Sequence, residues 1–186
     1  MIFEEKKIIL KDGTTAVLKT PETEDAEKQL NCIKATTVET PYFSRTIEDW
    51  DGFTAEKEKE WIQGVRDSKN SLVISCYINN EIAGNCDITF KVGSKTSHRA
   101  TVGISIQKKY WNNGIGTAMF DELIKAALNH EGTEFIDLEM VEGNNRAKAL
   151  YEKFGFETVS VKPNFFKQKD GTYQNLVYMQ KILKKV

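Results

Sequence analysis

Residues 110–117 read YWNNGIGT and place two glycines directly before a run of helix-forming residues. The first N–H groups of a helix have no partner inside the helix, and the helix dipole adds partial positive charge there. Glycine carries no Cβ atom that would hold a ligand away from the backbone. Thr117 adds a hydroxyl donor in the first helical turn. These residues predict a site where backbone donors bind a phosphate group.

Two phosphate-binding motifs invite comparison with this loop. The P-loop sequence GxxxxGK[ST] is absent from the chain. Gly114-Ile115-Gly116 supplies the GxG of dinucleotide-binding folds, and Asp137 lies at a suitable distance for a ribose contact. However, Met119 occupies the position of the third glycine, and seven residues separate the preceding apolar run from Gly114. A dinucleotide-binding protein is therefore the weaker interpretation.

Residues 144–156 read NNRAKALYEKFGF and contain a second set of residues that could do chemistry. In a helix, Ala147, Leu150 and Phe154 would form an apolar stripe, which places Tyr151 at its border. A tyrosine phenol has an ordinary pKa of about 10, so at neutral pH it is protonated and able to donate its proton. The alternative is that Tyr151 only packs its ring on the core.

Together these segments resemble the GNAT superfamily of N-acetyltransferases. Residues 106–128, IQKKYWNNGIGTAMFDELIKAAL, look like the family's acetyl-CoA-binding motif, Q/R-x-x-G-x-G/A between a strand and a helix. Residues 135–159, FIDLEMVEGNNRAKALYEKFGFETV, are similar to its second signature, in which an asparagine and an alanine precede Leu-Tyr-Glu-Lys and Gly-Phe. The resemblance covers about residues 72–161. Trp111 departs from it, because glutamine or arginine is usual at that position.

The resemblance implies particular roles for residues of this chain. The glycine loop would bind the pyrophosphate of acetyl-CoA, the preceding strand would pair with the pantetheine arm, and Tyr151 would be the general acid. Gly103 either marks a bulge whose freed N–H polarises the thioester carbonyl or is a tolerated small residue. No metal is implied. The implied coenzyme contacts are Ile104, Ser105, Ile106, Trp111, Asn112, Asn113, Gly114, Ile115, Gly116, Thr117 and Asn144, the last of which is also a suitable N-cap.

Two parts of such a site stay open in the sequence. An alkylammonium group must lose its proton before it attacks, and Glu139 and His98 are candidate bases. Each could equally be a solvated surface residue, and a chain of water molecules could then accept the proton in place of a side chain. Because the loop lacks basic residues, the positive charge for the phosphates would come from Lys108, Lys109 or Lys148.

The predicted function is direct transfer of an acetyl group from acetyl-CoA to a primary amine. No cysteine lies within either signature, which agrees with a route that forms no acetyl-enzyme. The acceptor is either a small molecule or a protein N-terminus, and four aromatic residues, Tyr42, Phe43, Trp50 and Phe53, either shape its pocket or cap the core. The alternative from another class is a non-catalytic acyl-CoA sensor, which would have no need of Tyr151.

The intervening elements predict an α+β fold of three α/β/α layers. Strand patterns around Asp12-Gly13, Asn79-Asn80 and Asp170-Gly171, and at residues 100–107 and 135–141, predict a mixed, mostly antiparallel sheet of about seven strands with helices on both faces. This is the GNAT-like acyl-CoA N-acyltransferase fold. We expect one domain over residues 1–186, with an acceptor-side part at about 1–70, a coenzyme-binding core at about 71–161 and a C-terminal strand pair at about 156–183.

The overall composition limits the partners and the cellular compartment that we expect for this domain. A formal net charge of −1 gives no electrostatic reason to expect nucleic acid or an anionic membrane as a partner. The N-terminus MIFEEKKIIL is too charged for a signal peptide, and three widely spaced cysteines fit free thiols, so we expect a cytoplasmic protein. The chain has only two histidines, and they lie far apart in the sequence, so we do not expect a zinc site. The oligomeric state stays open, although dimers are frequent in the family.

Overall fold

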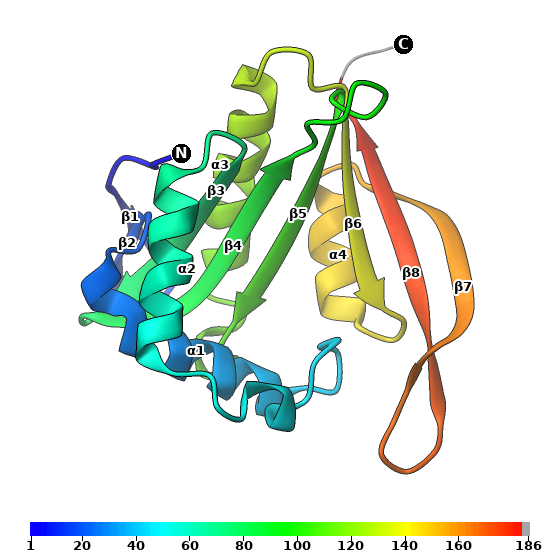
Figure 1. Ribbon diagram of the computed structural model, residues 1–186, viewed down its shortest axis with the longest axis horizontal. Helices are drawn as coiled ribbons and strands as arrows, with labels where there is room; N and C mark the ends of the chain where they lie inside the picture. Colours follow the sequence, from blue (N-terminus) through cyan, green and yellow to red (C-terminus); the bar gives the residue numbers. More distant parts are fainter. Residues whose placement is uncertain (184–186) are drawn as a thin grey trace.

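Eight strands form one sheet in the computed structural model, which describes residues 1–183 (Figure 1). Their order across the sheet is β1-β2-β3-β4-β5-β6-β8-β7, and only β5 and β6 pair in parallel. The predicted fold class is confirmed, with eight strands where about seven were expected. The strands are β1 Lys6–Ile9, β2 Thr15–Lys19, β3 Ser71–Ile78, β4 Glu81–Phe90, β5 Arg99–Ile106, β6 Phe135–Val141, β7 Glu157–Lys167 and β8 Tyr173–Ile182.

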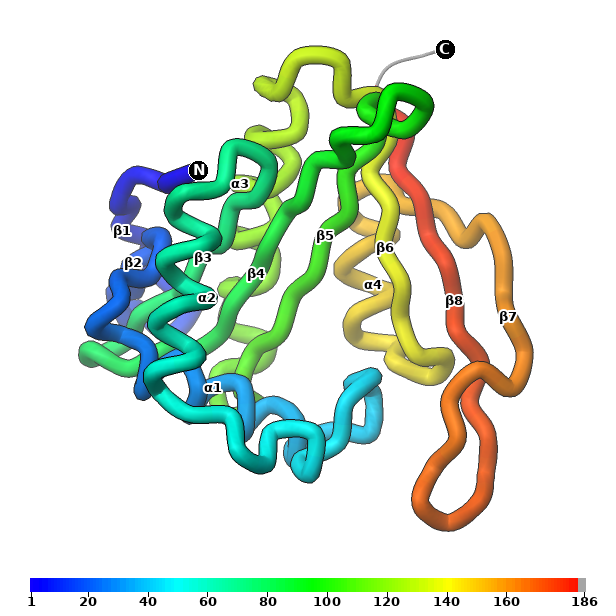
Figure 2. The backbone as a smooth tube through the Cα atoms, in the orientation of Figure 1, coloured from blue at the N-terminus to red at the C-terminus, as the bar shows by residue number. Residues whose placement is uncertain are grey.

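Helices cover both faces of this sheet (Figures 1 and 2). On one face, the Ser75 hydroxyl of β3 lies 3.4 Å from the Gln29 side chain of α1. On the other, the Cys86 thiol of β4 lies 4.0 Å from the Met119 carbonyl of α3. The α-helices are α1 Ala26–Glu39, α2 Ala55–Asp67, α3 Ile115–Asn129 and α4 Asn145–Lys153, and the short 3-10 turns are η1 Thr23–Asp25, η2 Ile47–Trp50 and η3 Lys108–Tyr110. Within residues 1–183, no helix combines the length and the apolar character needed to cross a lipid bilayer.

Local sequence explains where the helices near the motifs begin. The Thr54 side chain accepts a hydrogen bond from the Lys57 N–H, which caps α2. The Asn144 side chain accepts one from the Ala147 N–H at 3.2 Å, so its predicted N-cap role is confirmed. Gly114 caps α3 with a φ of 94°, a conformation that favours glycine.

One face of α3 anchors the glycine loop to the core. Met119, Phe120 and Leu123 have no exposed surface, and Ile115 at the first helical position is 1% exposed. Burying a side chain of this size contributes about 1.5–3 kcal/mol relative to leaving it in water. The start of α3 is therefore held firmly against the sheet, which fixes the backbone donors of the preceding loop.

The strands β4 and β5 approach each other so closely at Gly84 that this position has no room for a side chain. The register of β3 and β4 shifts between Cys76 and Tyr77, next to Gly84. A Cβ atom at Gly84 would lie 2.5 Å from the Ser105 carbonyl oxygen and 2.9 Å from the Ile106 Cα atom. Both obstacles are backbone atoms of β5, so they have little freedom to move away.

Replacement of Gly84 by alanine should therefore destabilise the fold. We expect the free energy of unfolding to fall by about 1–3 kcal/mol because the added methyl group overpacks the sheet. Gly64→Ala is the matched control, since Gly64 lies inside α2 with no atom within 4 Å of an added Cβ. The control should gain up to about 1 kcal/mol from helix propensity. Chemical denaturation of both variants measures the difference, and a Gly84→Ala protein as stable as the wild type would contradict this packing account.

Candidate active site

The neighbouring strands β5 and β6 separate soon after they begin (Figures 1 and 2). They pair only where Arg99, Ala100 and Thr101 face Phe135, Ile136 and Asp137. Beyond this point a cleft of about 1390 Å³ opens, lined from both faces of the sheet. Sites for drug-sized ligands are usually about 300–1,000 Å³, so this cleft has room for a large ligand and a second, smaller one.

An ion pair closes the end of the cleft where the strands still pair. Arg99 donates two hydrogen bonds to the Asp137 carboxylate, at 2.7 and 2.6 Å, and one to the Tyr178 hydroxyl at 3.1 Å. Burial opposes ionisation of Asp137, but the bonds from Arg99, Tyr178 and Gln180 outweigh it and lower the pKa of this carboxyl. These bonds hold the Asp137 carboxylate within the sheet, so it is not free to make the ribose contact considered above.

Separation of the strands leaves part of the β5 backbone without a strand partner. The Lys91 N–H donates to Arg99 and the Gln107 N–H donates to Ala83, so odd-numbered residues of β5 face β4. Because hydrogen-bonded pairs alternate in an antiparallel ladder, the N–H groups of Ile104 and Ile106 point into the gap. The N–H groups of the predicted contacts Ile104 and Ile106 are therefore available to pair with an extended ligand. The backbone of the predicted contact Ser105 instead pairs with β4.

The glycine loop forms one end of the cleft. Ala118 is the first residue of α3 whose N–H finds a helical partner, the Gly114 carbonyl at 3.0 Å. The N–H groups of Ile115, Gly116 and Thr117 have no hydrogen-bond partner among the described residues. Together they form the converging set of donors that the sequence predicts for an anion.

Side chains around the loop hold it in shape. The Trp111 indole donates to the Ile106 carbonyl at 2.7 Å, which ties the loop to the end of β5. Asn113 does not line the cleft, because its side chain bonds both the backbone and the carboxylate of Asp12. The remaining predicted contacts of the loop, and Asn144, do line it.

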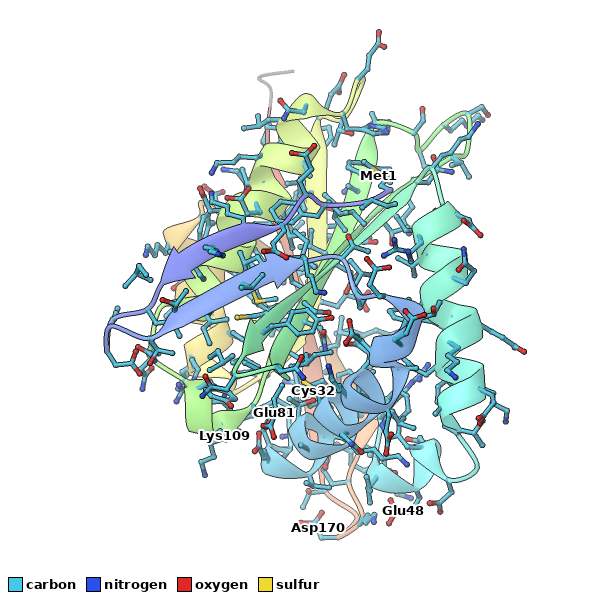
Figure 3. The ribbon with its side chains drawn as sticks, turned by 90° about the vertical axis from the view of Figure 1, so that its left-hand side faces the viewer. Met1, Cys32, Glu48, Glu81, Lys109 and Asp170 are labelled. Atoms are coloured by element: carbon cyan, nitrogen blue, oxygen red, sulfur yellow. The ribbon has the colours of Figure 1, made fainter. Side chains whose placement is uncertain are left out.

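Positive charge reaches the loop from residues that the sequence analysis did not select. The Arg146 guanidinium lies 3.8 Å from the centre of the Trp111 ring and donates to the Asn112 side chain at 3.0 Å. Arg146 and Lys11 line the cleft, whereas Lys108, Lys109 and Lys148 do not. Lys109 instead lies 3.4 Å from Glu81, beside which Figure 3 shows it, and Lys148 lies 3.7 Å from Glu152. None of the three lysines lines the cleft, and the cations that line it at the loop are Arg146 and Lys11. The arginine two residues after Asn144 was the sequence signal that could have identified the first of these.

Tyr151 enters the cleft from the helix α4. Its ring packs among Phe120 and Phe156, with centroids 5.3 and 6.2 Å away, and the residue is 7% exposed. Its hydroxyl has no hydrogen-bond partner among the described residues, and Tyr151 lines the cleft. Burial, and secondarily the negative charge of Asp87, raises the pKa of the phenol to about 12. Tyr151 is therefore a packed core residue whose phenol is also a fixed, protonated donor.

Asp87 is a carboxylate that the sequence analysis missed. It lies on β4 directly opposite Gly103 of β5, and its side chain opens into the cleft. Protein surrounds it on its other sides, so desolvation raises the pKa of Asp87 to about 6 although the residue itself is exposed to the cleft. A group that titrates so close to neutrality can act as a proton acceptor at physiological pH.

Gly103 makes room for this carboxylate. The register of β4 and β5 is regular throughout, so the hypothesis of a bulge at Gly103 is wrong. A Cβ atom at Gly103 would lie 2.8 Å from the Asp87 Oδ1 atom. The absence of a side chain therefore lets Asp87 lie flat over β5, close to the gap through which Tyr151 is reached.

The other candidates of the sequence analysis divide between cleft and surface. Glu139 lines the cleft, is exposed and has no ion-pair or hydrogen-bond partner among residues 1–183. His98 lies outside the cleft, in edge contact with the Phe135 ring at 5.7 Å. Of the four loop aromatics, Tyr42, Phe43 and Trp50 line the cleft, whereas Phe53 packs on Trp50.

Comparisons with known proteins agree with this geometry. Residues 34–156 match the Acetyltransferase (GNAT) family. An L-amino acid N-acetyltransferase of Escherichia coli is 24% identical over 122 residues, which cover 66% of this chain and 75% of that protein. A ribosomal protein bS18-alanine N-acetyltransferase of Haemophilus influenzae is 32% identical over 102 residues, which cover 54% and 65%. The crystal structure of a GNAT-family acetyltransferase from Streptococcus pneumoniae is similar with a TM-score of 0.82 at 25% identity, covering 90% of this chain and 99% of that one.

The chain belongs to the GNAT family of acetyltransferases. It is an acyltransferase, and its reaction is the transfer of an acetyl group to an amine. The interpretation as a dinucleotide-binding protein is wrong, since β5 and β6 are the only parallel pair of this sheet, whereas the sheet of a dinucleotide-binding fold is mostly parallel.

The φ of Gly114 supplies a test of the anion site. Gly114→Ala would place a side chain at a φ of 94°, strain the loop by about 1–3 kcal/mol and displace the converging N–H groups. We expect the affinity for coenzyme A, measured by isothermal titration calorimetry, to fall about tenfold or more. Gly132→Ala is the control, because Gly132 has a similar φ of 79° with open space around it. Equal coenzyme A affinities in the two variants would contradict a binding role for the loop.

Proposed function

We propose that this chain acts as one N-acetyltransferase domain that moves an acetyl group from acetyl-CoA directly to a primary amine, on a small molecule or a peptide N-terminus. The observation that carries the proposal is that Tyr151 and Asp87, which come from different elements, line one cleft at the gap between β5 and β6. Tyr151 reaches it from α4, and Asp87 reaches it from the opposite face of the sheet.

Acetyl-CoA fits the residues that line the coenzyme half of the cleft. Its pyrophosphate would accept hydrogen bonds from the N–H groups of residues 114–117, with Arg146 and Lys11 supplying positive charge. Its pantetheine amides would pair with the backbone of Ile104 and the N–H group of Ile106, as a neighbouring strand would. The Asn144 side chain caps α4 at the edge of this half. Such an arrangement would direct the thioester towards Tyr151.

Two proton transfers accompany the acyl transfer in this proposal. The bound ammonium group first loses one proton to solvent. The neutral amine nitrogen then bonds to the acetyl carbon, and Asp87 accepts the second proton that this nitrogen loses. As the carbon–sulfur bond breaks, Tyr151 donates its phenolic proton to the departing thiolate. The phenolate then recovers a proton from Asp87 or solvent, so the products are an acetamide and a free thiol. The raised pKa of Tyr151 keeps it protonated until the sulfur leaves.

Tyr151→Phe tests the acid role. We expect kcat to fall by about 10²–10⁴-fold, the usual contribution of a positioned proton donor, while coenzyme A binds with unchanged affinity. Release of free thiol from acetyl-CoA in the presence of mixed amines measures turnover. Tyr173→Phe, on the exposed hairpin, should behave as the wild type. Unchanged turnover in Tyr151→Phe would remove the acid from the mechanism.

The pH profile tests Asp87. Because desolvation by the surrounding protein raises its pKa from 3.8 to about 6, the base is protonated and inactive in acid, and kcat/KM should rise through pH about 6 to a plateau. In Asp87→Asn, the rise of kcat/KM near pH 6 (the acid limb of the profile) should disappear, together with most of the activity. Glu139→Gln is the matched control in the same cleft and should retain the limb. A limb near pH 6 that survives in Asp87→Asn would assign the titration to another group.

A further inference from the structure

The acceptor half of the cleft lies on the α1/α2 face of the sheet. Because alternate side chains of a strand point to opposite faces, Asp87 shares this face with Gly103, which lies opposite it. Across the gap, Thr101 faces Asp137, so the odd-numbered residues of β6 lie on the same side. Glu139 is among these, and both it and Asp87 line the cleft. Two carboxylates without a cationic partner among the described residues thus flank the place where an acceptor must enter.

Few cations face the two carboxylates of this half. Arg45 and Lys162 lie on the outer Trp50 and Phe165 rings, at 5.0 and 4.7 Å from their centres, but do not line the cleft. Among the described residues, only three cationic side chains line the cleft, and two of them, Lys11 and Arg146, lie at the glycine loop. The third, Lys91, follows the end of β4 at the closed end of the cleft, about 13 Å along the strand from Asp87. Arg99 is held by Asp137 through two hydrogen bonds. An acceptor whose amine lies beside Asp87 would therefore find no cation next to it.

The outer walls of the acceptor half are aromatic. Tyr42, Phe43 and Trp50 come from the segment between α1 and α2, and Phe165 and Phe166 come from the end of β7. These segments are joined at the surface, where Lys169 of the β7–β8 hairpin forms an ion pair with Glu48 of η2. Figure 3 shows Asp170, at the tip of this hairpin, near Glu48. The pair links the two walls at the surface, and the aromatic side chains of the walls suit an apolar or aromatic group.

From these features we infer that the acceptor is a cationic amine that carries an apolar or aromatic group and no carboxylate beside the reacting nitrogen. The inference rests on the proposed function and specifies its substrate class. A free α-amino acid would bring its carboxylate next to Asp87 and Glu139, where like charges repel and no cation compensates. An arylalkylamine or the N-terminus of a peptide presents the same ammonium group without that charge. The E. coli relative named for L-amino acids would then differ from this chain in acceptor.

Matched acceptors test this inference directly. We would measure kcat/KM at saturating acetyl-CoA for phenethylamine and L-phenylalanine, which differ only in the carboxylate, and for L-phenylalaninamide. Phenethylamine should exceed phenylalanine by at least tenfold, and the amide should also exceed the free acid. Glu139→Gln should reduce the preference for phenethylamine over phenylalanine at least threefold. Glu142→Gln, which lies outside the cleft and bonds Asn175, should leave the preference unchanged.

Each remaining outcome counts against the inference in a different way. Equal or faster turnover of phenylalanine would overturn the inference while the proposed acetyl transfer stands. A preference for phenylalanine that Lys91→Ala removes would show that this lysine binds the acceptor carboxylate. Binding of acetyl-CoA without acetylation of any of the three acceptors or of a wider amine panel would overturn the proposed function, and the inference with it. A preference for phenethylamine that is unchanged in Glu139→Gln would overturn the role of Glu139 in selection.

Discussion

The early separation of β5 and β6 is the constraint on which the site depends. Parallel neighbours ordinarily continue to pair, but here pairing stops at Thr101 and Asp137. The backbone of Ile104 and Ile106 is left with polar groups that cost free energy unless a partner or water satisfies them. The same gap joins the two faces of the sheet, so a phenol from one face can act together with a carboxylate from the other. A fully paired sheet would bury these backbone groups and keep Tyr151 and Asp87 apart.

Stable packing around the gap allows the site to keep polar groups that lower the stability of the fold. Unpaired N–H groups at the start of α3 and a carboxyl with a pKa of about 6 are each less stable than ordinary alternatives. The buried face of α3, the aromatic cluster around Tyr151 and the Arg99–Asp137 ion pair hold them in position. Reactivity is thus supported by the rigidity of the neighbouring layers.

Residues with local signals could be predicted from the sequence. Gly114 and Asn144 sit next to the helices that they cap, and Tyr151 follows from the spacing of one short helix, so their placement depends on nearby residues. The placement of Asp87 is different, because it depends on the register opposite Gly103, sixteen positions further along the chain. Arg146 likewise reaches the loop through a long-range contact, with Trp111, that joins α4 to the loop. The strands and helices were predictable from periodicity, whereas the divergence of β5 and β6 has no signature in either strand.

Residue-resolved amide hydrogen exchange, with and without coenzyme A, tests the central claim most directly. If the gap and the loop hold the coenzyme, its addition should slow exchange at Ile104, Ile106 and residues 114–117. Exchange at Gly103 and Ser105 should change little, because these residues already pair with β4. An equal effect on odd and even residues of β5, or slowing confined to other parts of the chain, would contradict the account.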